Sequence, residues 1–150
     1  MKTASWIILV VISAATLLYS LNSLRIAYSS AHDRIGPASL TELSAGRPDV
    51  ATAIRARRAT AAAYAVGFNT LFLVIVLVPY RRGDIWAWWA LAGSAVVVTG
   101  LILLRVPLLG ISLGTPSAGM GAATANGALI QLAVVAVGLA LDAGRLKRKG

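Results

Sequence analysis

The sequence contains no cysteine, five acidic residues and one histidine in 150 positions. These shortages exclude a disulfide scaffold and a cysteine-ligated metal site, and they leave a carboxylate-rich metal cage without ligands. Charged residues make up 13% of the chain, against roughly 25% in soluble domains, whereas 58% of the residues are apolar. This balance argues against a water-soluble globule and predicts one integral membrane domain covering residues 1–150.

The apolar residues are concentrated in four runs. A membrane-spanning helix needs about 20 predominantly apolar residues, and the fourth run reaches that length only with the small residues that precede it. The predicted spans cover approximately residues 4–24, 59–80, 85–105 and 122–142, separated by loops at 25–58 and 106–121 and followed by a basic tail at 143–150. The predicted fold is an all-α, four-helix transmembrane bundle of up-down-up-down topology, with a short ordered helix in the first loop.

The first run also has features of a secretory signal, because Lys2 precedes it and small residues occupy positions 13–15. It is long for a signal core, so we expect it to be retained as the first span.

The fourteen basic residues mark the borders of the spans. With four spans, each side of the membrane carries seven of them, so the positive-inside rule does not fix the orientation. The compact RLKRK tail at 145–149 favours a cytoplasmic location for both termini. Eleven arginines against three lysines, with abundant alanine, are typical of a GC-rich bacterial genome, and we expect a bacterial cytoplasmic membrane protein.

The first loop contains recognisable helix signals. Residues 39–42, Ser-Leu-Thr-Glu, have the capping-box pattern of a short helix. Asp49 is the predicted N-cap of the next helix, which we expect over 50–79 with a length of about 45 Å. Its first turns carry Arg55, Arg57 and Arg58 outside the hydrocarbon or in the headgroup zone. The later connection, from Val106 onward, is rich in glycine and predicts a re-entrant or membrane-surface segment, with Pro107 stopping or kinking the third helix.

An aromatic and basic cluster surrounds the turn between the second and third spans. Its members are Tyr80, Arg81, Arg82, Trp86, Trp88 and Trp89. Such residues typically anchor a hairpin at headgroup depth, although an aromatic box for a cationic ligand is an alternative. The net charge of +9 lies at span borders, so anionic lipid headgroups, rather than nucleic acid, are the expected partner.

Ionisable groups inside a membrane are the first candidates for function. Apart from Arg105 at the border of the third span, the spans contain none before Asp142, which argues against a proton-coupled exporter. Arg58 and Asn69 share one face of their helix, and Gln131 and Asp142 share a stripe on another. The candidate polar core is therefore Arg55, Arg58, Asn69, Gln131 and Asp142. These residues either line a ligand site or, as we favour, mediate helix packing in lipid.

No catalytic residue, metal ligand or cofactor is predicted. His32, Asp33 and Arg34 form the one cluster with acid–base potential, and we interpret it as a solvated loop.

Residues 78–91, VPYRRGDIWAWWAL, resemble a motif of small bacterial membrane proteins of uncharacterised function, in which a YRRG[DE]xWAWW turn joins the second and third of four helices. The resemblance implies a four-helix architecture and no particular activity. Arg55, Arg58 and Asn69 echo the pattern of the eicosanoid- and glutathione-metabolising membrane proteins, but the spacing differs and their glutamate is absent. Fluoride channels and small multidrug exporters share only the size.

Together these patterns predict a small non-enzymatic membrane protein that associates with itself or with a larger membrane complex. A membrane enzyme or binder acting on a lipid-phase substrate is one alternative, and a small oligomeric channel or transporter is another.

Overall fold

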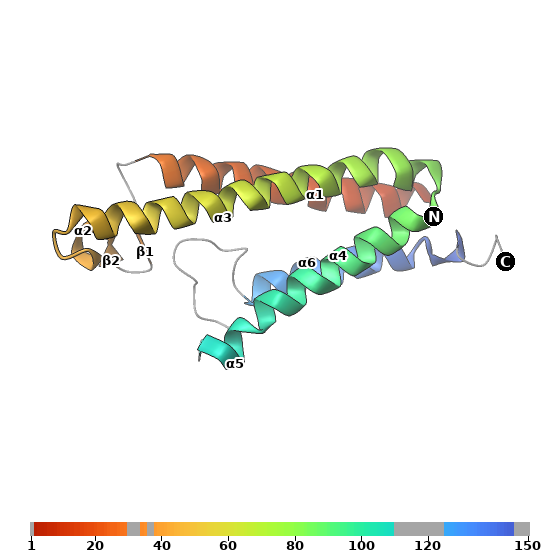
Figure 1. Cartoon of the computed structure of the whole chain (residues 1–150). Helices are drawn as coiled ribbons and strands as arrows, with labels where there is room; N and C mark the ends of the chain where they lie inside the picture. Colours follow the sequence, from red (N-terminus) through yellow and green to blue (C-terminus); the bar gives the residue numbers. More distant parts are fainter. Residues whose placement is uncertain (1, 30–33, 36–37, 110–124, 146–150) are drawn as a thin grey trace.

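The computed structural model describes residues 2–29, 34–35, 38–109 and 125–145. Within these ranges the chain is all-α, apart from one small two-stranded hairpin. Figure 1 shows two long helices lying side by side and a shorter pair that meets them at one end. The predicted all-α class is therefore confirmed for the described part of the chain.

The long pair consists of α1 (Lys2–Tyr28) and α3 (Pro48–Ile75), which run antiparallel and share the most extensive contact in the structure (Figure 1). Neither helix has a proline beyond its first turn. Their backbone hydrogen bonds can therefore continue without a break over 27 and 28 residues.

The connection between α1 and α3 contains a pair of short strands and a short helix. Strands β1 (Arg34–Ile35) and β2 (Ala38–Ser39) pair antiparallel, and helix α2 (Leu40–Leu43) follows. The predicted capping box is confirmed, because Glu42 N–H donates to Ser39 Oγ (3.2 Å) and Ser39 N–H donates to the Glu42 carboxylate (2.7 Å). Two donors at the start of α2 thus have acceptors.

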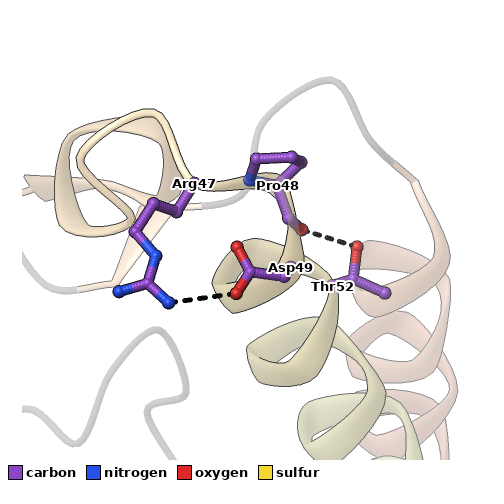
Figure 2. A network of polar contacts seen from close by, with 4 residues as sticks. All are labelled: Arg47, Pro48, Asp49 and Thr52. Atoms are coloured by element: carbon purple, nitrogen blue, oxygen red, sulfur yellow. Dashed lines mark hydrogen bonds and ion pairs between the residues drawn. The ribbon is translucent and has the colours of Figure 1, made fainter.

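The start of α3 differs from the prediction. The helix begins at Pro48 instead of Val50, and Arg47 rather than Asp49 is its N-cap. Proline suits the first helical position because it has no N–H to lose there and its φ is already helical. Asp49 lies in the first turn and accepts from Arg47 Nη2 at 3.1 Å, while the Thr52 hydroxyl donates to the Pro48 carbonyl at 2.8 Å (Figure 2). The exposed ion pair contributes little stability.

At its other end α3 widens into the π-helical turn η1 (Val76–Tyr80). Pro79 has no N–H, so the carbonyl four residues before it loses its α-helical partner, and a local widening accommodates the proline. Gly83, at φ 92°, then reverses the chain, and the N–H groups of Gly83 and Asp84 both donate to the Pro79 carbonyl at 3.1 Å. The predicted tight turn is therefore fixed by its own backbone.

The second pair consists of α4 (Ile85–Leu103) and α6 (Ala125–Ala140). Leu104 separates α4 from the short helix α5 (Arg105–Leu109), ahead of the Pro107 at which we expected a break. Helix α6 has 16 residues and leads to the 3₁₀ turn η3 (Ala143–Arg145). Residues 110–124, which include most of the glycine-rich connection and the predicted start of the fourth span, lie outside the described residues, as does most of the basic tail.

The helices pack in the order α3, α1, α6, α4, because α1 contacts both α3 and α6, and α4 contacts α6. The two pairs meet near the α3–α4 turn and diverge away from it (Figure 1). The buried apolar core lies at this meeting point. Its members are Leu9, Phe72, Val76, Tyr80, Ala87, Leu91, Val135 and Leu139.

Three helical stretches of the described chain, 3–28, 48–80 and 85–108, are long and apolar enough to cross a membrane. In the most apolar 18 residues of each stretch, 22%, 22% and 12% of the residues, respectively, are buried inside the structure. Most of their apolar surface therefore faces outward. Helix α6 is apolar but shorter.

Candidate functional site

A buried chain of hydrogen bonds joins three helices near the α3–α4 turn. The Ser5 hydroxyl of α1 donates to the Gly138 carbonyl of α6 at 2.6 Å. Since that carbonyl can only accept, the Ser5 oxygen receives the Tyr80 hydroxyl, also at 2.6 Å. Ser5 and Tyr80 are both fully buried. Buried hydroxyl groups need such partners, and here the partners connect α1, η1 and α6.

Two indole groups connect further helices at the same level. Trp6 Nε1 donates to the Val76 carbonyl of η1 at 3.2 Å, and Trp88 Nε1 of α4 donates to the Leu139 carbonyl of α6 at 3.1 Å. Both rings are half-buried. Together with the Tyr80 bond, these contacts link α1, η1, α4 and α6 through polar groups at one end of the bundle. We call Ser5, Trp6, Val76, Tyr80, Trp88, Gly138 and Leu139 the turn-end cluster.

Gly138 allows the close approach that this cluster requires. A Cβ placed on Gly138 would lie 2.9 Å from Leu9 Cδ2 and 3.0 Å from Leu9 Cγ. Leu9 is itself fully buried, so its side chain has little room to move. Small residues at helix interfaces in lipid have this effect, because close packing there replaces the hydrophobic drive.

A second polar contact lies farther along the α1–α3 pair. Asn69 Nδ2 donates to Ser20 Oγ at 2.8 Å and to the Ala65 carbonyl at 2.9 Å. Ser20 in turn donates to the Thr16 carbonyl at 2.8 Å. Asn69 and Ser20 are buried, with 9% and 5% of their surfaces exposed. The amide nitrogen of Asn69 therefore donates one hydrogen bond to α1 and one within its own helix α3.

The Asn69–Ser20 contact predicts a measurable coupling. We expect Asn69→Ala and Ser20→Ala to show an interaction free energy of about 0.6 kcal/mol in a double-mutant cycle, the average for such bonds in membrane proteins. The free energy of unfolding can be measured by titrating the purified protein with a denaturing detergent. Asn69→Ala combined with Thr99→Ala is the control. Thr99 is about as buried as Ser20, but it lies on α4 and forms no hydrogen bond with Asn69. A coupling no larger than that of the control pair would contradict the prediction.

The other predicted polar-core residues do not join Asn69. Gln131 is half-buried on α6, and no hydrogen bond between described residues involves it. Arg55 and Arg58 are half-buried near the start of α3, and Asp142 is buried beyond the end of α6. The five candidates are therefore spread along the molecule.

The predicted anchor residues divide into two groups. Arg81, Arg82, Trp86 and Trp89 are exposed, and the Trp89 ring lies edge-on to Trp88 at 4.9 Å between centroids. The sequence pattern grouped Tyr80 and Trp88 with them, whereas the structure buries Tyr80 completely and turns the Trp88 indole toward α6.

Ser5, Trp6 and Gly138 were not predicted to be members of the turn-end cluster. One signal was present, because Ser5, Ser13 and Ser20 recur at helical spacing along α1 and are all buried. The partners of these serines carry no comparable signal. Gly138 takes part through its backbone carbonyl, which every residue has. A tryptophan near the start of a helix, such as Trp6, is compatible with several different roles.

No group of three or more metal-ligating side chains occurs among the described residues. His32 and Asp33, the possible acid–base pair, lie outside them. The polar groups that the structure brings together are therefore hydroxyl, indole, amide and carbonyl groups, whose evident chemistry is hydrogen bonding between helices. No protein-family model, curated protein or solved structure matches this chain.

Proposed function

We propose that this protein is a multi-pass integral membrane protein with a non-enzymatic role, exerted through lateral association with a second copy or with other membrane chains. Four helices cross the bilayer in this proposal, in up-down-up-down order. The membrane is the bacterial cytoplasmic membrane, and both termini lie in the cytoplasm. The resemblance of residues 78–91 to bacterial four-helix proteins is consistent with this topology.

The spacing of charges along α3 and η1 supports a transmembrane position. Arg58 and Arg81 are 23 residues apart, or about 35 Å along a helix, which slightly exceeds a hydrocarbon core of about 30 Å. Asn69 lies halfway between them and thus near the bilayer centre. A polar group at that depth requires an internal partner, and Ser20 and the Ala65 carbonyl accept its hydrogen bonds.

The non-enzymatic part of the proposal rests on one observation, which is that the buried polar side chains form hydrogen bonds to other helices of the protein. Asn69, Ser5 and Tyr80 are buried and bond to other helix groups. An enzyme or binder for a lipid-phase substrate would instead bring Asn69 and Gln131 to a common site that reaches Arg58. Asn69 lies on α3 and Gln131 on α6, and no hydrogen bond joins the two in the described chain, which favours a packing role.

The outward apolar surface supports lateral association. Helix α4 has the smallest buried share of the three long helices. Its exposed face includes Trp89, Gly93, Val96, Val97 and Gly100. Lipid or another protein chain must cover such a face, since an apolar surface of this length is unfavourable in water.

The absence of cysteine makes the topology directly testable. Single cysteines at Thr41, Arg82 and Gly144 occupy exposed positions in the first loop, the α3–α4 turn and the end of the chain. In intact cells, we expect a membrane-impermeant maleimide to label the first position and spare the other two. Disrupted cells, in which all three should react, are the control. Labelling of Gly144→Cys from outside would exclude the fourth crossing in this orientation.

Association is tested by cross-linking in the native membrane. We expect Val97→Cys on α4 to form a disulfide-linked dimer or a cross-link to another membrane chain. Leu71→Cys on α3 is the matched control, because both positions are 59% exposed. Native mass spectrometry in mild detergent measures the masses of the complexes. A lone monomer carrying a defined hydrophobic small molecule, without any cross-link, would favour the lipid-phase binder instead.

A further inference from the structure

The α3–α4 turn presents two arginines in a fixed backbone. Arg81 and Arg82 follow η1 directly and are exposed. The turn after them is held by the two N–H groups that donate to the Pro79 carbonyl. The guanidinium groups therefore project from a defined point of the bundle rather than from a loose loop.

The Arg81 guanidinium is held further by an aromatic ring. Its carbon Cζ lies 5.2 Å from the centre of the Trp6 ring, which is within the range of a cation–π contact. The hydrogen bond from Trp6 Nε1 to the Val76 carbonyl fixes the orientation of that ring. A guanidinium that contacts a ring with its flat face keeps its five in-plane N–H donors for other acceptors.

Those donors are not used by carboxylates of the described chain. Asp84 is half-buried two residues after Arg82, and Asp142 is buried at the same end of the bundle. Arg81 and Arg82 form no ion pair with a carboxylate of the described residues, whereas Arg47 pairs with Asp49 at the opposite end of α3. The positive charge at the turn is thus open to an external anion.

The surrounding aromatic residues indicate which anion fits. Trp86 and Trp89, 57% and 60% exposed, lie within the first two turns of α4. Exposed indole rings prefer the boundary between headgroups and acyl chains. An anion at the adjacent arginines would therefore be at headgroup depth, where phosphodiesters are present, and arginine binds phosphate with two parallel hydrogen bonds.

We propose that Arg81 and Arg82, with Arg81 positioned by Trp6, form a binding site for the headgroup of an anionic phospholipid of the phosphatidylglycerol type. The inference rests on the proposed membrane location. Beyond that location, it names an anionic phospholipid as a partner and the α3–α4 turn as its binding site.

The four tryptophans of the chain provide the readout, because Trp6, Trp86, Trp88 and Trp89 all lie at this end of the molecule. Their fluorescence is quenched by lipids brominated on the acyl chains. The protein is reconstituted in vesicles of phosphatidylcholine that contain equal fractions of either brominated phosphatidylglycerol or brominated phosphatidylcholine. The ratio of quenching by the two lipids gives the local preference for the anionic lipid.

We expect a preference for phosphatidylglycerol of at least about fivefold, and we expect Arg81→Gln and Arg82→Gln each to reduce it by about fivefold. Arg57→Gln is the matched control, since Arg57 is an exposed arginine near the opposite end of α3 and should leave the preference unchanged. Trp6→Phe and Trp6→Leu both remove the indole donor, but only the leucine variant removes the ring, so only Trp6→Leu should lower the preference.

Three kinds of outcome overturn the inference, each in a different way. Equal quenching by both lipids in the unmodified protein, or an unchanged preference when both arginines are replaced, excludes the lipid site while leaving the membrane location intact. No quenching by either lipid excludes the membrane location itself. Loss of the preference on adding inorganic phosphate at millimolar concentration would assign the site to a free anion instead of a lipid.

Discussion

Replacing Tyr80 by alanine is expected to cost about 3–5 kcal/mol of unfolding free energy, as for other large aromatic side chains removed from a core. Tyr80 is fully buried against the core cluster, so its removal leaves a cavity at the point where α1, α4 and α6 meet. The free energy of unfolding can be measured by detergent titration or from the shift of the thermal transition. Tyr64→Ala is the control, because Tyr64 is 78% exposed and should tolerate the change within about 0.5 kcal/mol.

The direction of the hydrogen bonds predicts an asymmetry between two smaller changes. Tyr80→Phe removes a donor but leaves the Ser5 hydroxyl bonded to the Gly138 carbonyl. Ser5→Ala leaves the buried Tyr80 hydroxyl without that acceptor, which costs about 1–3 kcal/mol. We therefore expect Ser5→Ala to be the more destabilising of the two and to cost less in the Tyr80→Phe background. Purely additive effects would show that the two hydroxyl groups do not interact.

Valine at position 138 is expected to destabilise the protein by about 1–3 kcal/mol through overpacking. Even the first added carbon would lie 2.9 Å from Leu9 Cδ2, and valine adds two methyl groups beyond it. The helices α1 and α6 must then separate, which also stretches the bond from Ser5 to the Gly138 carbonyl. Detergent titration measures this cost, and we expect Gly138→Ala to show a smaller effect of the same sign.

Two comparisons isolate the steric cause. Gly67→Ala on α3 should be neutral or slightly stabilising, because an added Cβ meets no atom within 4 Å there and alanine favours helix. In a Leu9→Ala background, Gly138→Ala should be tolerated, since the leucine atoms that it meets are gone. If Gly138→Ala costs the same in both backgrounds, contact with Leu9 is not the reason for the glycine.

Several local features of this chain could be predicted from the sequence because their physical causes are local. The capping box at Ser39 and Glu42 is set by residues three positions apart, and it forms as predicted. The break before Pro107 follows from the missing N–H and the steric demand of one ring. The predicted start of α3 was two residues too late. Asp49 is a suitable N-cap and Pro48 a suitable first helical residue, and the helix begins at Pro48.

The polar contacts between helices were not predictable in the same way. Helical spacing placed Asn69 on one face of its helix, but it could not show whether that face would meet α1, α6 or lipid. The structure pairs Asn69 with Ser20 and leaves Gln131 apart on α6. Any ligand site assembled from spacing alone would have joined residues that the fold separates.

The sequence by itself determined that this chain is apolar, nearly free of acids and built of helices long enough to cross a membrane, because composition and helical period act along the chain. Only the tertiary structure decided which helices meet. Tyr80 was grouped by its neighbours with the surface anchors, yet the π-turn at Pro79 and the close approach at Gly138 place it inside, bonded to Ser5. Such a bond joins residues 75 positions apart, and its formation depends on the packing of three helices together.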